Sequence, residues 1–96
     1  MRISDQEANT IQTLTQRIFG EGSVVRLFGS RTRDDLKGGD IDLYIQPADT
    51  HNLLDKRLRF ASQLEMALGE QKIDIIIARQ PQRLIEQQAL STGIRL

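Results

Sequence analysis

The chain has 96 residues, of which 13 are Lys or Arg and 13 are Asp or Glu, so its formal net charge is zero. We expect a single domain over residues 1–96 that buries roughly two-thirds of the surface exposed on unfolding, and the balanced charge argues against strong direct nucleic-acid binding. The chain has no Cys, which excludes disulfides, thiolate nucleophiles and metal sites built from Cys. It has one His, His51, so a metal site built from several His is excluded too. Any bound metal therefore needs oxygen ligands.

The N-terminal segment is predicted to be a helix and not a targeting signal. It lacks the apolar stretch of a signal peptide, and no later run approaches the ~20 apolar residues of a membrane span. We therefore expect a cytoplasmic protein without membrane contact. Residues 4–19 have Ser4 and Glu7 at capping-box spacing, followed at helical intervals by three apolar residues, Ile11, Leu14 and Ile18.

Three short segments rich in β-branched residues are predicted to be strands, over residues 23–29, 40–45 and 72–78. Residues 51–69, between the second and third strands, are predicted to be a helix with an apolar stripe of Leu54, Leu58, Ala61, Leu64 and Leu68. A last helix is predicted within residues 80–93, with Pro81 near its start and an apolar side of Leu84, Ile85 and Ala89. This order predicts an α+β fold with three core strands flanked by helices.

Two aspartates lie within the second predicted strand. Side chains alternate along a strand, so Asp40, Asp42 and Tyr44 share one face, and pairing with the third strand would bring Asp74 beside them. Two such acids can simply be the wet face of an edge strand. Three converging carboxylates, however, repel one another unless a divalent cation neutralises them, and oxygen ligands suit Mg²⁺ or Mn²⁺. The set predicts a metal site of the kind used in phosphoryl or nucleotidyl transfer.

Gly29 and Ser30 follow the first predicted strand and are interpreted as a triphosphate cradle. Glycine allows backbone amides to approach a phosphate, and the serine hydroxyl can contact a further oxygen. Arg31 and Arg33 can add charge-assisted contacts to the nucleotide, although arginines in loops are also commonly solvated. Together these four residues form the predicted nucleotide-binding set.

Other polar residues allow less specific interpretations. Tyr44 can pack on the helix of residues 51–69 or flank the acidic site, and packing is favoured. His51 is expected to be a surface or capping residue. The basic run of Lys56, Arg57 and Arg59 is expected to be the solvated face of that helix, with contact to a partner as the alternative.

The sequence contains Gly29-Ser30, then nine residues, then Asp40-Ile41-Asp42, and later Asp74. This pattern resembles the DNA polymerase β-like nucleotidyltransferase superfamily, and more narrowly its minimal nucleotidyltransferases. The resemblance implies an αβαβα-type domain with a small mixed sheet. It also implies that Asp40 and Asp42 bind the metal, that Asp74 helps to activate the acceptor hydroxyl, and that Gly29 and Ser30 contact the triphosphate of ATP.

The resemblance also implies a partner. Minimal nucleotidyltransferases are similar to one half of a two-gene toxin-antitoxin system, in which the antitoxin transfers AMP from ATP to a tyrosine of a small helical HEPN toxin. The length of the chain is consistent with such a hetero-oligomer, because 96 residues leave no second domain to hold an acceptor. Two alternatives stay open: a catalytically weak binding module that neutralises its partner by complex formation, and a subunit of a small-molecule nucleotidyltransferase.

Overall fold

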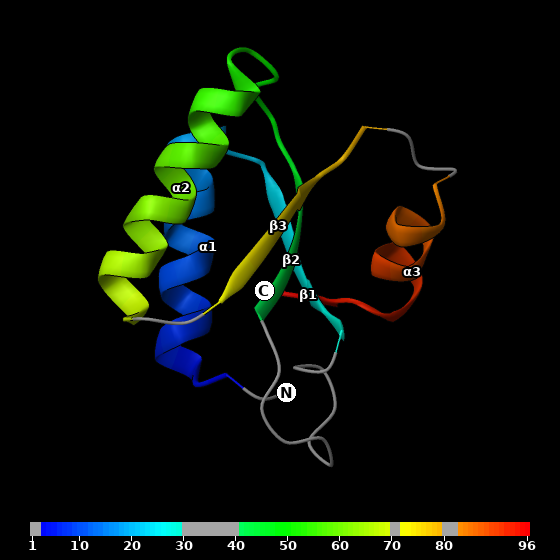
Figure 1. The fold of residues 1–96 in the computed structure, drawn as a ribbon, viewed down its shortest axis with the longest axis horizontal. Coiled ribbons are helices and arrows are strands. Elements are labelled where there is room, and N and C mark those ends of the chain that lie inside the picture. Colours follow the sequence, from blue (N-terminus) through cyan, green and yellow to red (C-terminus); the bar gives the residue numbers. More distant parts are fainter. Residues whose placement is uncertain (1–2, 30–40, 70–71, 80–82) are drawn as a thin grey trace.

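The computed structural model describes residues 3–29, 41–69, 72–79 and 83–96. Two helices cover one face of a sheet and a third helix covers the other face (Figure 1). The elements in chain order are α1 (Asp5–Phe19), β1 (Val24–Phe28), β2 (Ile41–Gln46), α2 (Leu53–Leu68), β3 (Ile73–Ile77), α3 (Leu84–Thr92) and β4 (Ile94–Arg95). The predicted α+β class is confirmed. None of the helices in the described ranges is both long and apolar enough to cross a membrane.

The sheet is mixed and has the strand order β3-β2-β1-β4. β1 is antiparallel to β2 and to β4, whereas β2 and β3 are parallel and are connected through α2, as a parallel pair requires. The expectation of three strands was incomplete, because β4 adds a fourth. β4 has only two residues, too few to show an alternating pattern, and Leu96 extends the pairing by donating its N–H to the carbonyl of Val25 at 3.0 Å.

The main core lies between α1, α2 and the sheet. The alternation predicted for β2 is confirmed, because Ile41, Leu43 and Ile45 are all fully buried on this face. Phe19 of α1 meets Phe60 of α2 edge-to-face, with ring centroids 5.3 Å apart. Each such fully buried side chain stabilises the fold by ~1.5–3 kcal/mol relative to an exposed one. This packing holds β2 rigidly at the centre of the sheet.

The start of α1 has the predicted capping box. Glu7 donates its N–H to the Ser4 hydroxyl at 3.0 Å, and Ser4 donates its N–H to Glu7 Oε1 at 2.9 Å. Two amides that the first helical turn would leave without partners are thereby satisfied. The predicted apolar side of α1 is also confirmed, because Ile11, Leu14 and Ile18 are buried.

The predicted faces of α2 and α3 were partly wrong. Leu54 and Leu58 are 71% and 58% exposed, because α2 is rotated so that Phe60 and Leu64 face the sheet. On α3, Leu84 is 84% exposed, whereas Ala89 is buried as predicted and Glu86 is buried as well. In both helices part of the predicted face is buried, Leu64 on α2 and Ala89 on α3, and packing against the sheet leaves the rest of that face exposed. Pro81 lies outside the described residues.

Lys56 was also misassigned to the solvated face of α2. Its side chain is buried, and its ammonium donates to Asp49 Oδ2 at 2.7 Å and to the carbonyl of His51. This hydrogen bond, with those from the His51 backbone and ring, holds the pKa of the Asp49 carboxyl well below its usual range. His51 itself is exposed, as expected. The contacts among Asp49, His51 and Lys56 lie in the turn between β2 and α2.

Candidate functional site

The candidate site lies at the end of the sheet at which β1 ends and β2 and β3 begin. The three strands meet there because β1 runs antiparallel to β2 and β3 runs parallel to it. Asp42 is the register partner of Phe28 on one side and of Asp74 on the other. The two aspartates are therefore direct cross-strand neighbours.

Both aspartates line a cavity of about 490 Å³ beneath α3. Asp42 is half-buried and Asp74 is exposed, so the first is shielded by the protein while the second is open to an incoming molecule. The other lining residues come from β1, α2, β3 and α3, namely Phe28, Gly29, Arg57, Ile75, Ile76, Ile85 and Gln88. The cavity thus combines two carboxylates with an apolar wall and one guanidinium.

Four predicted site residues, Ser30, Arg31, Arg33 and Asp40, lie outside the described residues. Within the described ranges no group of three His, Cys, Asp or Glu side chains could hold a metal ion. The structure therefore brings together two of the three predicted carboxylates, Asp42 and Asp74. Both offer hard oxygen donors from neighbouring strands, and this donor chemistry fits a divalent cation such as Mg²⁺.

Gly29 is required at its position for two reasons. Its φ of +80° belongs to the left-handed region that other residues rarely adopt. In addition, a Cβ at Gly29 would lie 2.3 Å from Asp42 Oδ2. The backbone after β1 therefore passes directly against the Asp42 carboxylate. The sequence predicts that this glycine approaches a phosphate, which stays a prediction, whereas the structure shows that it approaches the Asp42 carboxylate.

Gly29→Ala is expected to displace the Asp42 carboxylate as well as strain the backbone. Gly22→Ala is the matched control, because Gly22 has a φ of +95° but no atom within 4 Å of an added Cβ. Both variants should lose ~1–2 kcal/mol of stability from the left-handed backbone, and only Gly29→Ala should lose more. Denaturant unfolding measures both losses. Equal losses in both variants would show that the contact with Asp42 has no consequence.

Tyr44 packs on α3 and not on α2, which corrects one of the two expectations for it. It lies on the same face of β2 as Asp42, in a second small core with Phe28 and Ala89. Its hydroxyl donates to Glu86 Oε1 at 2.8 Å, and the Arg79 N–H donates to the same oxygen at 3.1 Å. The sequence did not predict a role for Glu86. The only indication of its burial was its position three residues before Ala89, which places both on the same side of the helix.

Burial, and secondly the hydrogen bond and negative charge of Glu86, raise the pKa of Tyr44 to about 12. Because the folded chain keeps this proton to a higher pH than the unfolded chain, stability is complete below pH 10. It should fall by about 2–3 kcal/mol as the pH rises to 12. Tyr44 is the only tyrosine, so ultraviolet titration reports it directly. Ionisation near pH 10 in the folded protein, as in urea, would contradict the buried contact.

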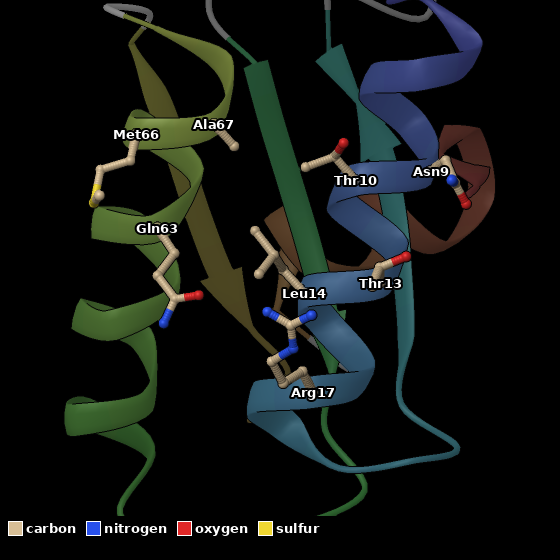
Figure 2. A pocket seen from close by; sticks show the side chains of 8 residues that line it. All are labelled: Asn9, Thr10, Thr13, Leu14, Arg17, Gln63, Met66 and Ala67. Carbon is tan, nitrogen blue, oxygen red and sulfur yellow. The ribbon is translucent and has the colours of Figure 1, made fainter.

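A larger cavity, of about 640 Å³, lies between α1 and α2 on the other face of the sheet. Figure 2 shows Leu14 and Arg17 extending from α1 into the gap that Gln63 borders on α2, whereas Met66 points away from α1. Among the described residues that line this cavity there is no carboxylate. The smaller, acidic cavity is therefore the better candidate for a site that binds a cation.

The comparisons with known proteins agree with this geometry. The profile of a family described as polymerase beta, nucleotidyltransferase, matches residues 8–96. A chain in the structure of tri-AMPylated Shewanella oneidensis HEPN toxin in complex with MNT antitoxin is 25% identical, with a TM-score of 0.72 over 97% of this chain and 71% of that chain. A toxin-antitoxin structure with AMP-PNP matches at 26% identity and a TM-score of 0.74, over 92% and 70% of the two chains.

The toxin-antitoxin pair MntA-HepT also contains a similar chain. It is 24% identical, with a TM-score of 0.71 over 96% of this chain and 70% of that chain, which shows a likeness of fold alone. No protein of curated function matches the sequence.

Proposed function

Because this chain belongs to the polymerase beta nucleotidyltransferase family, we propose that it transfers AMP from ATP to a tyrosine of a HEPN toxin and acts as the antitoxin of that toxin. The observation that carries this proposal is the register pairing of Asp42 with Asp74 beside Gly29. Support for the donor and the partner comes from similar chains in a complex with AMP-PNP and in a complex with a tri-AMPylated HEPN toxin.

In the proposed reaction the acceptor hydroxyl attacks the α-phosphorus of ATP. A new oxygen–phosphorus bond forms, the bond to the bridging oxygen breaks, and pyrophosphate leaves. Asp74, which is exposed, accepts the proton of the hydroxyl. Asp40, Asp42 and Asp74 would hold Mg²⁺ or Mn²⁺, which neutralises charge on the phosphoryl oxygens when bound. Gly29 and Ser30, with Arg31 and Arg33, are proposed to position the triphosphate.

Tyr44 is not suited to be the acceptor of the proposed reaction. Tyr44 is the only tyrosine of this sequence, and its side chain is 1% exposed. Its hydroxyl is also engaged by Glu86 at 2.8 Å. A group so enclosed has no route to the α-phosphorus of a bound nucleotide, so modification of Tyr44 itself is disfavoured.

The test is incubation of the full chain with purified HEPN partner and ATP labelled at the α-phosphate. Label is expected on the partner with Mg²⁺ or Mn²⁺, and none is expected with EDTA or with ATP labelled at the γ-phosphate. A partner variant without its accepting tyrosine is the control. If the two proteins bind each other but no label is transferred, the protein is a neutralising binding module and the proposed activity is wrong.

A further inference from the structure

A third cavity, of about 370 Å³, follows the outer edge of β3 between α2 and α3. β3 is the last strand in the sheet order, so no strand of the described chain pairs with this edge. Three arginines line this cavity, Arg57 of α2, Arg79 after the end of β3, and Arg83 directly before α3. Together with four apolar residues they form what we call the arginine groove: Leu53, Arg57, Ile75, Ile76, Ile77, Arg79 and Arg83.

The arginine groove brings together three arginines in a chain whose net charge is zero. Among the described residues that line it there is no acid. Arg57 donates its Nε to the Ile75 carbonyl at 3.2 Å, and Arg83 Nε lies 3.6 Å from Glu86 Oε2. Arg79 uses only its backbone N–H on Glu86, and within the described ranges its exposed guanidinium has no carboxylate partner. The groove therefore presents cationic groups whose charge is only partly balanced.

The groove adjoins the acidic cavity on the side where an acceptor would enter. The two cavities share Arg57, Ile75 and Ile76. Gly29 lies at the end of β1, two strands away from β3. In an in-line displacement the attacking and leaving oxygens lie on opposite sides of the phosphorus. If the phosphates lie near Gly29, the attacking hydroxyl comes from the β3 side, where Asp74 and the groove are found.

We infer that the arginine groove binds an acidic, extended segment of the acceptor protein and so places its hydroxyl beside Asp74. This inference rests on the proposed function. Carboxylates of the segment would pair with Arg57 and Arg79, because guanidinium groups bind carboxylates in a bidentate manner. The apolar floor suits peptide side chains. The lining has no aromatic residue on which a nucleobase could stack, which favours a peptide over RNA.

The test uses the full chain and a fluorescein-labelled peptide of six Glu around one Tyr, followed by fluorescence anisotropy. We expect saturable binding that weakens with salt. The double variant Arg57→Ala with Arg79→Ala should bind the peptide at least tenfold more weakly than the unmodified protein. The single variant Arg79→Ala should weaken peptide binding by a smaller factor. Arg59→Ala is the matched control, because Arg59 is an exposed α2 residue outside the groove, and it should bind like the unmodified protein.

Two further arms separate the possible outcomes. Asp42→Asn should abolish AMP transfer and keep peptide binding, so loss of the proposed activity and loss of the groove are distinguishable. A peptide with Gln in place of every Glu should not bind. Equal peptide affinity in the arginine variants and the control overturns the inference. So does tighter, arginine-dependent binding of a single-stranded RNA hexamer, because it would assign the groove to nucleic acid.

Discussion

Asp42→Asn and Asp74→Asn are each expected to reduce AMP transfer by ~100-fold or more without reducing the stability of the metal-free protein. Asparagine keeps the shape of the side chain but removes the charge that holds a cation or accepts a proton. The two acids are direct partners on parallel strands, and like charges placed opposite each other are destabilising. Removing one charge should therefore leave the free energy of unfolding unchanged or slightly higher.

Labelled transfer to the proposed HEPN partner and urea unfolding in EDTA measure the two quantities. Asp55→Asn is a suitable control, because Asp55 is an exposed acid of α2 that pairs with Arg59 at 3.4 Å, away from the site. It should change neither quantity much. Loss of ~3–5 kcal/mol in Asp42→Asn would reveal a structural ion pair instead of a metal ligand, and transfer at the normal rate would also contradict the assignment.

Glu86→Ala is expected to lower the free energy of unfolding by ~3–5 kcal/mol. Glu86 is fully buried, and the substitution leaves the Tyr44 hydroxyl and the Arg79 N–H without their acceptor. It also removes the carboxylate beside Arg83. Through Glu86, the Tyr44 hydroxyl of β2, the Arg79 N–H after β3 and the Arg83 guanidinium before α3 are held together. The packing of α3 against the sheet should therefore weaken.

Glu86→Gln and Tyr44→Phe provide the matched comparisons. Glutamine keeps an oxygen acceptor for both hydrogen bonds, so it should cost much less than alanine, and Tyr44→Phe should cost ~1–3 kcal/mol. The double variant Tyr44→Phe with Glu86→Ala should be less destabilised than the sum of its parts, because the two residues share one hydrogen bond. Strict additivity in urea unfolding would mean that this bond does not contribute.

The sequence predicted the sheet better than the helices. In β2, alternation is strict and one face is wholly apolar, so the burial of Ile41 and Leu43 could be predicted from spacing. In α2, apolar residues lie on more than one side, and Leu54 and Leu58 are exposed because Phe60 occupies the core instead. Only the partner surface, here the ring of Phe19, decides which side is buried.

The candidate site could be predicted where it depends on residue type and strand register. Asp42 and Asp74 follow from the alternation of two strands that turned out to be neighbours. The burial of Glu86 could not be predicted, because it depends on a contact with Tyr44, which lies 42 positions earlier in the chain. The close approach of Gly29 to Asp42 likewise depends on how two strands meet, which no local pattern records.

The pairing of Asp42 with Asp74 also has a consequence for folding kinetics. The 16 residues of α2 lie between the two strands, and parallel strands pair only after their connection has crossed the sheet. Helices form from local contacts and are fast, whereas this pairing is non-local and slow. The two acids therefore meet late, and amide exchange between β2 and β3 should require global opening. Loss of the proposed transfer activity and unfolding should consequently share one denaturant midpoint, with no partly folded form that retains transfer.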